Sequence, residues 1–145
     1  MSAKAFVDTN ILIYAYDQSS GTKHEQARGL VRELWEYRNG ALSTQILQEF
    51  AFYLRRKVAR PLSAKQTRQT LEEYLNWQII VNTAASTVQA LEIEERYGIS
   101  FWDALVVHAA QAAGAEILYS EDLSDGQSYG SVRVINPFKS KSSSR

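Results

Sequence analysis

The sequence contains no cysteine and only two histidines, His24 and His108, which lie far apart. The absence of cysteine excludes disulfides, thiol nucleophiles and thiolate metal sites. Two isolated histidines also argue against a histidine-based metal site. A metal ion bound by this chain would therefore be a hard cation held by carboxylate oxygens.

The sequence also lacks a net charge and any long apolar run. Sixteen basic residues balance sixteen acidic ones, so binding of nucleic acid would need a local basic patch rather than an overall field. No apolar stretch reaches the length of a membrane span, and the N-terminus has no secretory-signal pattern. We therefore expect a cytoplasmic protein with no membrane partner.

The 145 residues suffice for one domain with its own hydrophobic core. Short β-prone apolar runs alternate with segments of helical periodicity. The predicted strands cover residues 4–8, 41–43, 77–81, 116–120 and 132–135. The predicted helices cover residues 10–16, 22–37, 44–57, 63–76, 84–97 and 100–113.

This alternation predicts an α/β fold, in which helices cover both faces of a central parallel sheet of about five short strands. The domain is expected to span residues 1–138, and the small polar residues 139–145 are expected to form a disordered tail. Two capping boxes, Thr22 with Glu25 and Ser63 with Gln66, mark predicted helix starts.

Four acidic residues stand in otherwise apolar surroundings. Asp8 follows the first predicted strand and Asp122 follows the fourth. Because ligands bind beyond the carboxyl ends of parallel strands, these two side chains are expected at the same edge of the sheet. Asp103 lies in the apolar segment "SFWDALVVHAAQAA", and Glu49 borders the apolar face of the predicted helix over residues 44–57.

Each acid taken alone also has a purely structural interpretation. Asp8 would cap the helix that follows it, and Asp103 would form a capping box with Ser100. Glu49 would be a boundary residue with its carboxylate in water. If the acids converge, however, their charges repel one another, and a divalent cation removes that repulsion. Oxygen ligands alone predict Mg²⁺, with Mn²⁺ as the alternative.

The segments "FVDTNILIY", "QEF", "FWDALVVHAA" and "ILYSEDLSDG" resemble, in this order and spacing, the motifs of the PIN domain. They resemble in particular the VapC-type toxins of toxin–antitoxin pairs, over about residues 4–138. The resemblance implies that Asp8, Glu49, Asp103 and Asp122 correspond to the four acids that hold magnesium. It also implies endoribonuclease activity, a cognate antitoxin protein as partner, and a homodimer.

The same resemblance implies supporting roles for two polar residues. Asn10 corresponds to a residue that supports the site behind the first acid, and Ser120 to a small hydroxyl residue near the fourth. Asp122 is the better match to the fourth acid by its spacing from the strand. Asp125 could share or replace its role, and Glu121 remains an alternative.

The densest basic stretch is "RRKVAR", which begins about two helical turns beyond Glu49. Its basic residues could bind RNA phosphates beside the acids, or could simply be a solvated helix end. They are Arg55, Arg56, Lys57 and Arg60. We expect Trp102 to be a core residue, with stacking on an RNA base as the lesser alternative.

The function predicted from the sequence is Mg²⁺-dependent endoribonuclease cleavage, in which a metal-activated water hydrolyses a phosphodiester. The alternatives are a catalytically weak PIN-like module that binds RNA or a protein partner, and a DNA nuclease of related architecture. An aspartyl phosphatase of the haloacid dehalogenase type is disfavoured, because Asn10 stands where a second aspartate is needed.

Overall fold

The computed structural model describes residues 3–139. Residues 140–145, most of the predicted polar tail, lie outside the described residues. The strands are β1 (Ala5–Val7), β2 (Gly40–Ser43), β3 (Gln78–Ile80), β4 (Ile117–Tyr119), β5 (Ser128–Tyr129) and β6 (Val132–Ile135). The α-helices are α1 (Thr9–Tyr16), α2 (Thr22–Tyr37), α3 (Thr44–Arg56), α4 (Ala64–Tyr74), α5 (Ala84–Tyr97) and α6 (Phe101–Ala112).

Within residues 3–139, one six-stranded sheet has the order β3-β2-β1-β4-β6-β5. The five strands predicted from the sequence all pair in parallel, as expected. The sixth, β5, pairs antiparallel with β6 at the edge of the sheet. β5 was not predicted, because two residues inside a polar loop carry no alternating apolar pattern.

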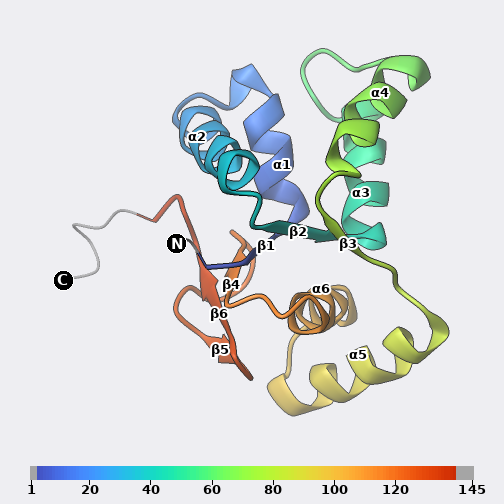
Figure 1. Cartoon of the computed structure of the whole chain (residues 1–145), viewed down its shortest axis with the longest axis vertical. Coiled ribbons are helices and arrows are strands. Elements are labelled where there is room, and N and C mark those ends of the chain that lie inside the picture. The colour runs from blue at the N-terminus through green and yellow to red at the C-terminus, as the bar shows by residue number, and fades with distance from the viewer. Residues whose placement is uncertain (1–2, 140–145) are drawn as a thin grey trace.

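Helices cover both faces of this sheet, as predicted (Figure 1). Helices α1 to α4 lie on one side, where α1 packs on α2 and α3, and α3 packs on α4. Helices α5 and α6 pack together on the other side. Within the part of the chain that the structure describes, no helix is long and apolar enough to cross a membrane.

The helix ends follow the local sequence signals at most positions. Ser63 and Gln66 form the predicted reciprocal capping box at the start of α4. Gly98 ends α5 in the left-handed conformation, which glycine adopts without steric cost. The predicted capping box at Thr22 is wrong, because Gly21 is the N-cap of α2 and provides no side-chain hydrogen bond.

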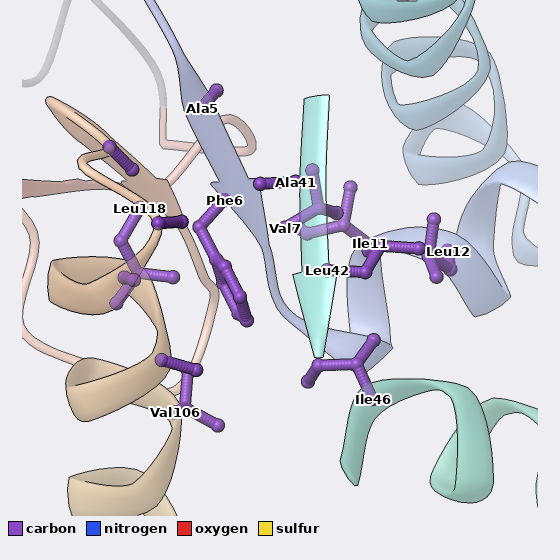
Figure 2. Close-up of a cluster of buried hydrophobic side chains, with 14 of the residues drawn as sticks. Ala5, Phe6, Val7, Ile11, Leu12, Ala41, Leu42, Ile46, Val106 and Leu118 are labelled. Atoms are coloured by element: carbon purple, nitrogen blue, oxygen red, sulfur yellow. The ribbon is translucent and has the colours of Figure 1, made fainter. Parts of the chain in front are cut away.

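The core forms around the central strands, and Figure 2 shows the side chains that meet there. Phe6 and Val7 of β1 are fully buried, as is Leu118 of the neighbouring β4. A central parallel strand is covered on both faces, so it needs consecutive apolar residues rather than an alternating pattern. This burial fixes the position of the residue that follows Val7.

The strand register brings the ends of β1 and β4 together. Val7 pairs with Tyr119, and the backbone N–H of Asp8 donates to the carbonyl of Tyr119 at 2.9 Å. The next residues along the two strands, Asp8 and Ser120, therefore leave the sheet side by side. The carboxyl end of β2 leads directly into α3, the helix that carries Glu49.

Gly40 of β2 packs closely against the ring of Trp77. A Cβ atom at this position would lie 2.5 Å from Cε3 and Cζ3 of the Trp77 ring. We expect Gly40→Ala to lower the free energy of unfolding by about 1–3 kcal/mol, because the ring and backbone must move apart. Urea denaturation followed by circular dichroism measures this change.

The control is Gly29→Ala, because Gly29 lies inside α2 and its added Cβ would have no atom within 4 Å. This substitution should raise the free energy of unfolding by up to about 1 kcal/mol, since alanine favours helix over glycine. Equal stability of Gly40→Ala and the wild type would contradict the close packing on Trp77.

Candidate active site

A cleft of about 810 Å³ opens at the carboxyl ends of β1 and β4. The four acids predicted from the sequence all line it, although they come from four separate segments of the chain. Asp8 follows β1, Glu49 lies on α3, Asp103 lies in the first turn of α6, and Asp122 follows β4. The fold therefore brings the predicted acids to one place.

Asp8 is 6% exposed, and both of its carboxylate oxygens accept hydrogen bonds. Oδ1 accepts a hydrogen bond from the Thr9 backbone N–H at 2.8 Å, so Asp8 also caps α1. Oδ2 accepts a hydrogen bond from the Ser120 hydroxyl at 2.8 Å. Burial raises the pKa of Asp8 to about 6, although these two hydrogen bonds lower it, and the charges of Asp122 and Glu49 raise it further.

The Ser120 hydroxyl links the first acid to the loop that carries the fourth. Ser120 is fully buried. Its Oγ donates to Asp8 and accepts hydrogen bonds from the backbone N–H groups of Asp122 at 3.2 Å and Leu123 at 3.4 Å. The structure thus places Ser120 between Asp8 and the backbone of Asp122.

Glu49 is half-buried rather than extended into water, and two neighbours hold its carboxylate. Oε1 accepts a hydrogen bond from the Thr9 hydroxyl at 2.5 Å, and Oε2 accepts one from the Gln45 amide at 3.3 Å. Thr9 and Gln45 were not among the residues predicted from the sequence. Gln45 lies one helical turn before Glu49, which is the spacing that could have identified it.

Asp103 is half-buried in the first turn of α6. Its backbone N–H donates to the hydroxyl of Ser100, the N-cap, at 3.1 Å. Burial raises the pKa of Asp103; a side-chain hydrogen bond with Ser100 lowers it, and the charge of Asp122 raises it again. The prediction that Trp102 is a core residue is wrong, because this side chain is 63% exposed and lines the cleft.

Asp122 is exposed, and its Oδ2 accepts a hydrogen bond from the Asn10 amide at 3.1 Å. Asp125 does not line the cleft. Its carboxylate accepts a hydrogen bond from the Asn136 backbone N–H at 2.8 Å and lies 3.8 Å from Lys139 Nζ. Asp122, rather than Asp125, therefore shares the cleft with the other three acids.

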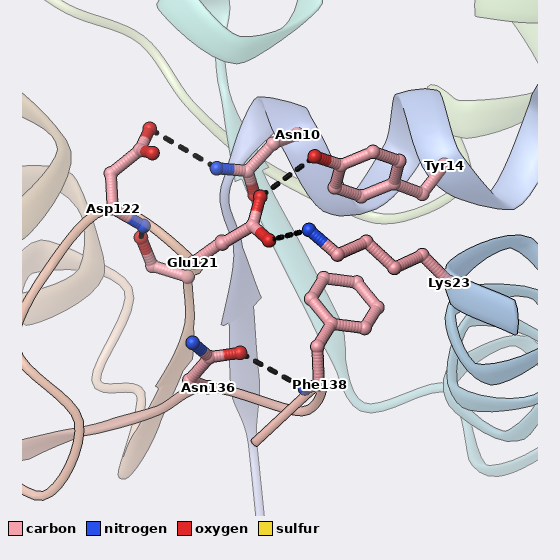
Figure 3. Close-up of polar contacts among 8 residues, drawn as sticks. Asn10, Tyr14, Lys23, Glu121, Asp122, Asn136 and Phe138 are labelled. Atoms are coloured by element: carbon pink, nitrogen blue, oxygen red, sulfur yellow. Dashed lines mark hydrogen bonds and ion pairs between the residues drawn. The ribbon is translucent and has the colours of Figure 1, made fainter. Parts of the chain in front are cut away.

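Glu121 points toward Tyr14 and Lys23 and away from Asp122, as Figure 3 shows. Its Oε1 accepts a hydrogen bond from the Tyr14 hydroxyl at 2.7 Å, and its Oε2 pairs with the ammonium group of Lys23. Burial alone would raise the pKa of Glu121, but the hydrogen bonds from Lys23 and Tyr14 hold it below its usual value. The negative charge of Glu121 is thus already balanced by Lys23.

The four predicted basic residues are all exposed, but they differ in their position relative to the cleft. Lys57 lines it, together with the exposed aromatic residues Phe52 and Tyr53. The Arg56 guanidinium lies 5.4 Å from the centre of the Phe52 ring. Arg55 and Arg60 do not line the cleft, so the basic stretch reaches it at its Lys57 side.

The donor atoms of the cleft fit a hard divalent cation. Four carboxylates are accompanied by Oδ1 of Asn10, which is buried and has no hydrogen-bond partner among residues 3–139. The raised pKa values of Asp8 and Asp103 indicate carboxylates that lack a compensating positive charge. No three Asp, Glu or His side chains of the described chain already stand as a finished metal-binding group. Binding would therefore require Asp103 and Asp122 to turn toward Asp8.

Comparison with known proteins identifies the fold. The model of the PIN domain matches residues 5–124, which is most of the chain. The chain belongs to the PIN domain family. No curated protein matches it in sequence.

Solved structures share the fold at low sequence identity. A toxin–antitoxin complex from Klebsiella pneumoniae has a TM-score of 0.67 and 22% identity, covering 93% of this chain and 98% of its own. The Mycobacterium tuberculosis toxin VapC20 has a TM-score of 0.61 and 21% identity, covering 81% and 89%. VapBC2 from Rickettsia felis has a TM-score of 0.59 and 20% identity, covering 90% and 96%.

The raised pKa of Asp8 predicts a pH-dependent stability of the metal-free protein. Folding moves this pKa from 3.8 to about 6, so between these values the folded state holds more protons than the unfolded state. The free energy of unfolding should therefore fall as the pH rises through this window, by about 3 kcal/mol. Urea denaturation in EDTA at several pH values measures this slope.

The control is Asp8→Asn, which keeps the shape of the side chain and cannot ionise. Its free energy of unfolding should decline less than that of the wild type between about pH 4 and pH 6. Parallel profiles for the two proteins would show that Asp8 ionises normally despite its burial.

Proposed function

We propose that this PIN domain is a metal-dependent endoribonuclease that hydrolyses phosphodiester bonds, and the toxin of a toxin–antitoxin pair. The observation that carries the proposal is the convergence of Asp8, Glu49, Asp103 and Asp122 in one cleft. Membership of the PIN family supports nuclease activity. RNA as substrate is supported by a structural neighbour, the Mycobacterium tuberculosis VapC20, which is described as a Sarcin-Ricin loop cleaving toxin.

The four acids would hold Mg²⁺, with Mn²⁺ as an alternative. When bound, such a cation lowers the pKa of a water molecule and stabilises charge on the scissile phosphate. Asp8 is the best candidate for a direct ligand, because the Ser120 hydroxyl and the Thr9 N–H fix its carboxylate. A ligand fixed before binding loses little conformational freedom when the cation arrives.

The remaining acids have different environments and therefore different proposed roles. Glu49 is held through both oxygens by Thr9 and Gln45, which suits it to orient a water molecule and accept its proton. Asp103 and Asp122 have fewer constraints, and they would complete the cation site by turning toward Asp8. The amide of Asn10 restrains Asp122 at one oxygen.

The rim of the cleft supplies groups that suit a nucleic acid. Lys57 offers a positive charge for a phosphate that flanks the scissile bond. Trp102, exposed beside Asp103, offers a flat surface on which an unpaired base can stack. These features favour a single-stranded or looped segment of RNA over a regular duplex, whose bases are already stacked.

We also propose an antitoxin protein and a second copy of this chain as partners. Among the structural neighbours, the Klebsiella pneumoniae structure is a toxin–antitoxin complex. Large exposed apolar side chains provide surface for protein contacts, and they include Phe52, Val81, Val88, Leu91 and Trp102. Light scattering of the purified chain distinguishes a dimer from a monomer.

The acids and the cation are tested together by cleavage of total RNA and of single-stranded DNA. With Mg²⁺ the wild type should cut RNA, and EDTA should abolish cutting. Asp8→Asn and Asp103→Asn should each reduce the cleavage rate by at least about a hundredfold, because each removes a proposed cation ligand. Single-turnover rates at fixed Mg²⁺ concentration provide the measurement.

The matched control compares two acids of the same loop. Asp122→Asn should reduce the rate, whereas Asp125→Asn should leave it close to the wild type, since Asp125 does not line the cleft. Undiminished cutting by the Asp8 and Asp103 variants would refute the acidic site. Binding of RNA without metal or cleavage would support the binding module instead, and cutting of DNA alone would support the DNA nuclease.

A further inference from the structure

Glu121, the residue before Asp122, belongs to a cluster that the proposed chemistry does not use. Tyr14 of α1 donates a hydrogen bond to one of its carboxylate oxygens, and Lys23 of α2 forms an ion pair with the other. Figure 3 shows these three side chains meeting beside Asn10 and Asp122. Two helices thus bind one residue of the loop that follows β4.

The Lys23 ammonium group lies between two aromatic rings as well as beside Glu121. It is 5.0 Å from the centre of the Tyr14 ring and 5.4 Å from that of Phe138. The two rings meet edge to face with their centres 5.2 Å apart. Such cation–π contacts add attraction that depends on where the cation sits. The segment after β6 therefore closes the cluster from the other side.

Helix α1 holds two successive loop residues with two of its own. Asn10 and Tyr14 are four positions apart, so their side chains lie on one face of the helix. Asn10 donates to Asp122, and Tyr14 donates to Glu121. The position of the Glu121 backbone, which the cluster restrains, sets where the adjacent Asp122 carboxylate can go.

A role in global stability alone does not account well for this arrangement. The side chains of Lys23 and Glu121 are 42% and 23% exposed, and ion pairs in contact with water contribute little to the free energy of folding. Asp122, by contrast, is an exposed loop carboxylate, whose entropy cost on binding a cation is high unless the loop is already ordered.

We propose that Glu121, Tyr14 and Lys23 form a clasp that positions Asp122 for binding the divalent cation. They are positioning residues, since none of them contacts the cation or the RNA in this scheme. The inference depends on the proposed metal-dependent function and adds three residues that increase the affinity of the site for Mg²⁺. The clasp acts on the loop before any cation is present.

The test measures Mg²⁺ binding by calorimetry, without RNA, for Lys23→Met and Tyr14→Phe. Each variant should raise the Kd for Mg²⁺ about tenfold, as the loss of groups that orient metal ligands commonly does. Lys23→Arg, which keeps the charge, should restore most of the affinity. The melting temperature should shift by no more than a few degrees in each case.

Lys139→Met is the matched control. It removes the partner of Asp125, an acid on the same loop that lies outside the cleft. Its Kd for Mg²⁺ should equal that of the wild type. An unchanged Kd in Lys23→Met and Tyr14→Phe, or an equal change in Lys139→Met, would overturn the clasp.

A second readout separates this inference from the proposed function. In metal-free protein, hydrogen exchange at the Asp122 and Leu123 amides reports the order of the loop, since both donate to Ser120. Exchange should be faster in Lys23→Met than in Lys139→Met, and equal rates would overturn the clasp. If the wild type binds no Mg²⁺ while the exchange rates differ, the metal-dependent function fails and the ordering of the loop stands.

Discussion

The hydrogen bond between the Ser120 hydroxyl and the buried carboxylate of Asp8 is the interaction on which the rest of the site depends. It exists because the register of β1 and β4 ends both strands at the same level. The same hydroxyl accepts the backbone N–H groups that begin the Asp122 loop. One buried oxygen atom therefore contacts both the carboxylate of the first acid and the backbone of the fourth.

Around this contact the acids fall into an inner and an outer pair. Asp8 and Glu49 are held through both carboxylate oxygens, and Thr9 contacts both of them. Asp103 and Asp122 lie on a helix start and a loop, with fewer constraints. The apolar core makes the inner pair rigid, but the same burial raises the pKa of Asp8 and so disfavours its charged form. A bound cation would stabilise the charged form, which links the packing of the fold to the proposed chemistry.

The architecture and the position of the acids could largely be predicted from the sequence. Continuous apolar runs identify buried parallel strands, and acids that follow such runs reach the same edge of the sheet. The partners of these acids were harder to predict. The pairing of Glu121 with Lys23 joins residues 98 positions apart, and no local pattern encodes it. Trp102 was misassigned because an aromatic residue in an apolar helix is usually buried, whereas here the first turn of α6 faces the cleft.

The four acids are proposed to form one divalent-cation site in this cleft. The most direct measurement is anomalous diffraction from crystals soaked in Mn²⁺, recorded near the manganese absorption edge. The account predicts an anomalous peak within ligand distance of the Asp8 carboxylate, with Asp103 or Asp122 turned toward it. A peak only at other surface acids, or no peak at a concentration that saturates binding in solution, would contradict it.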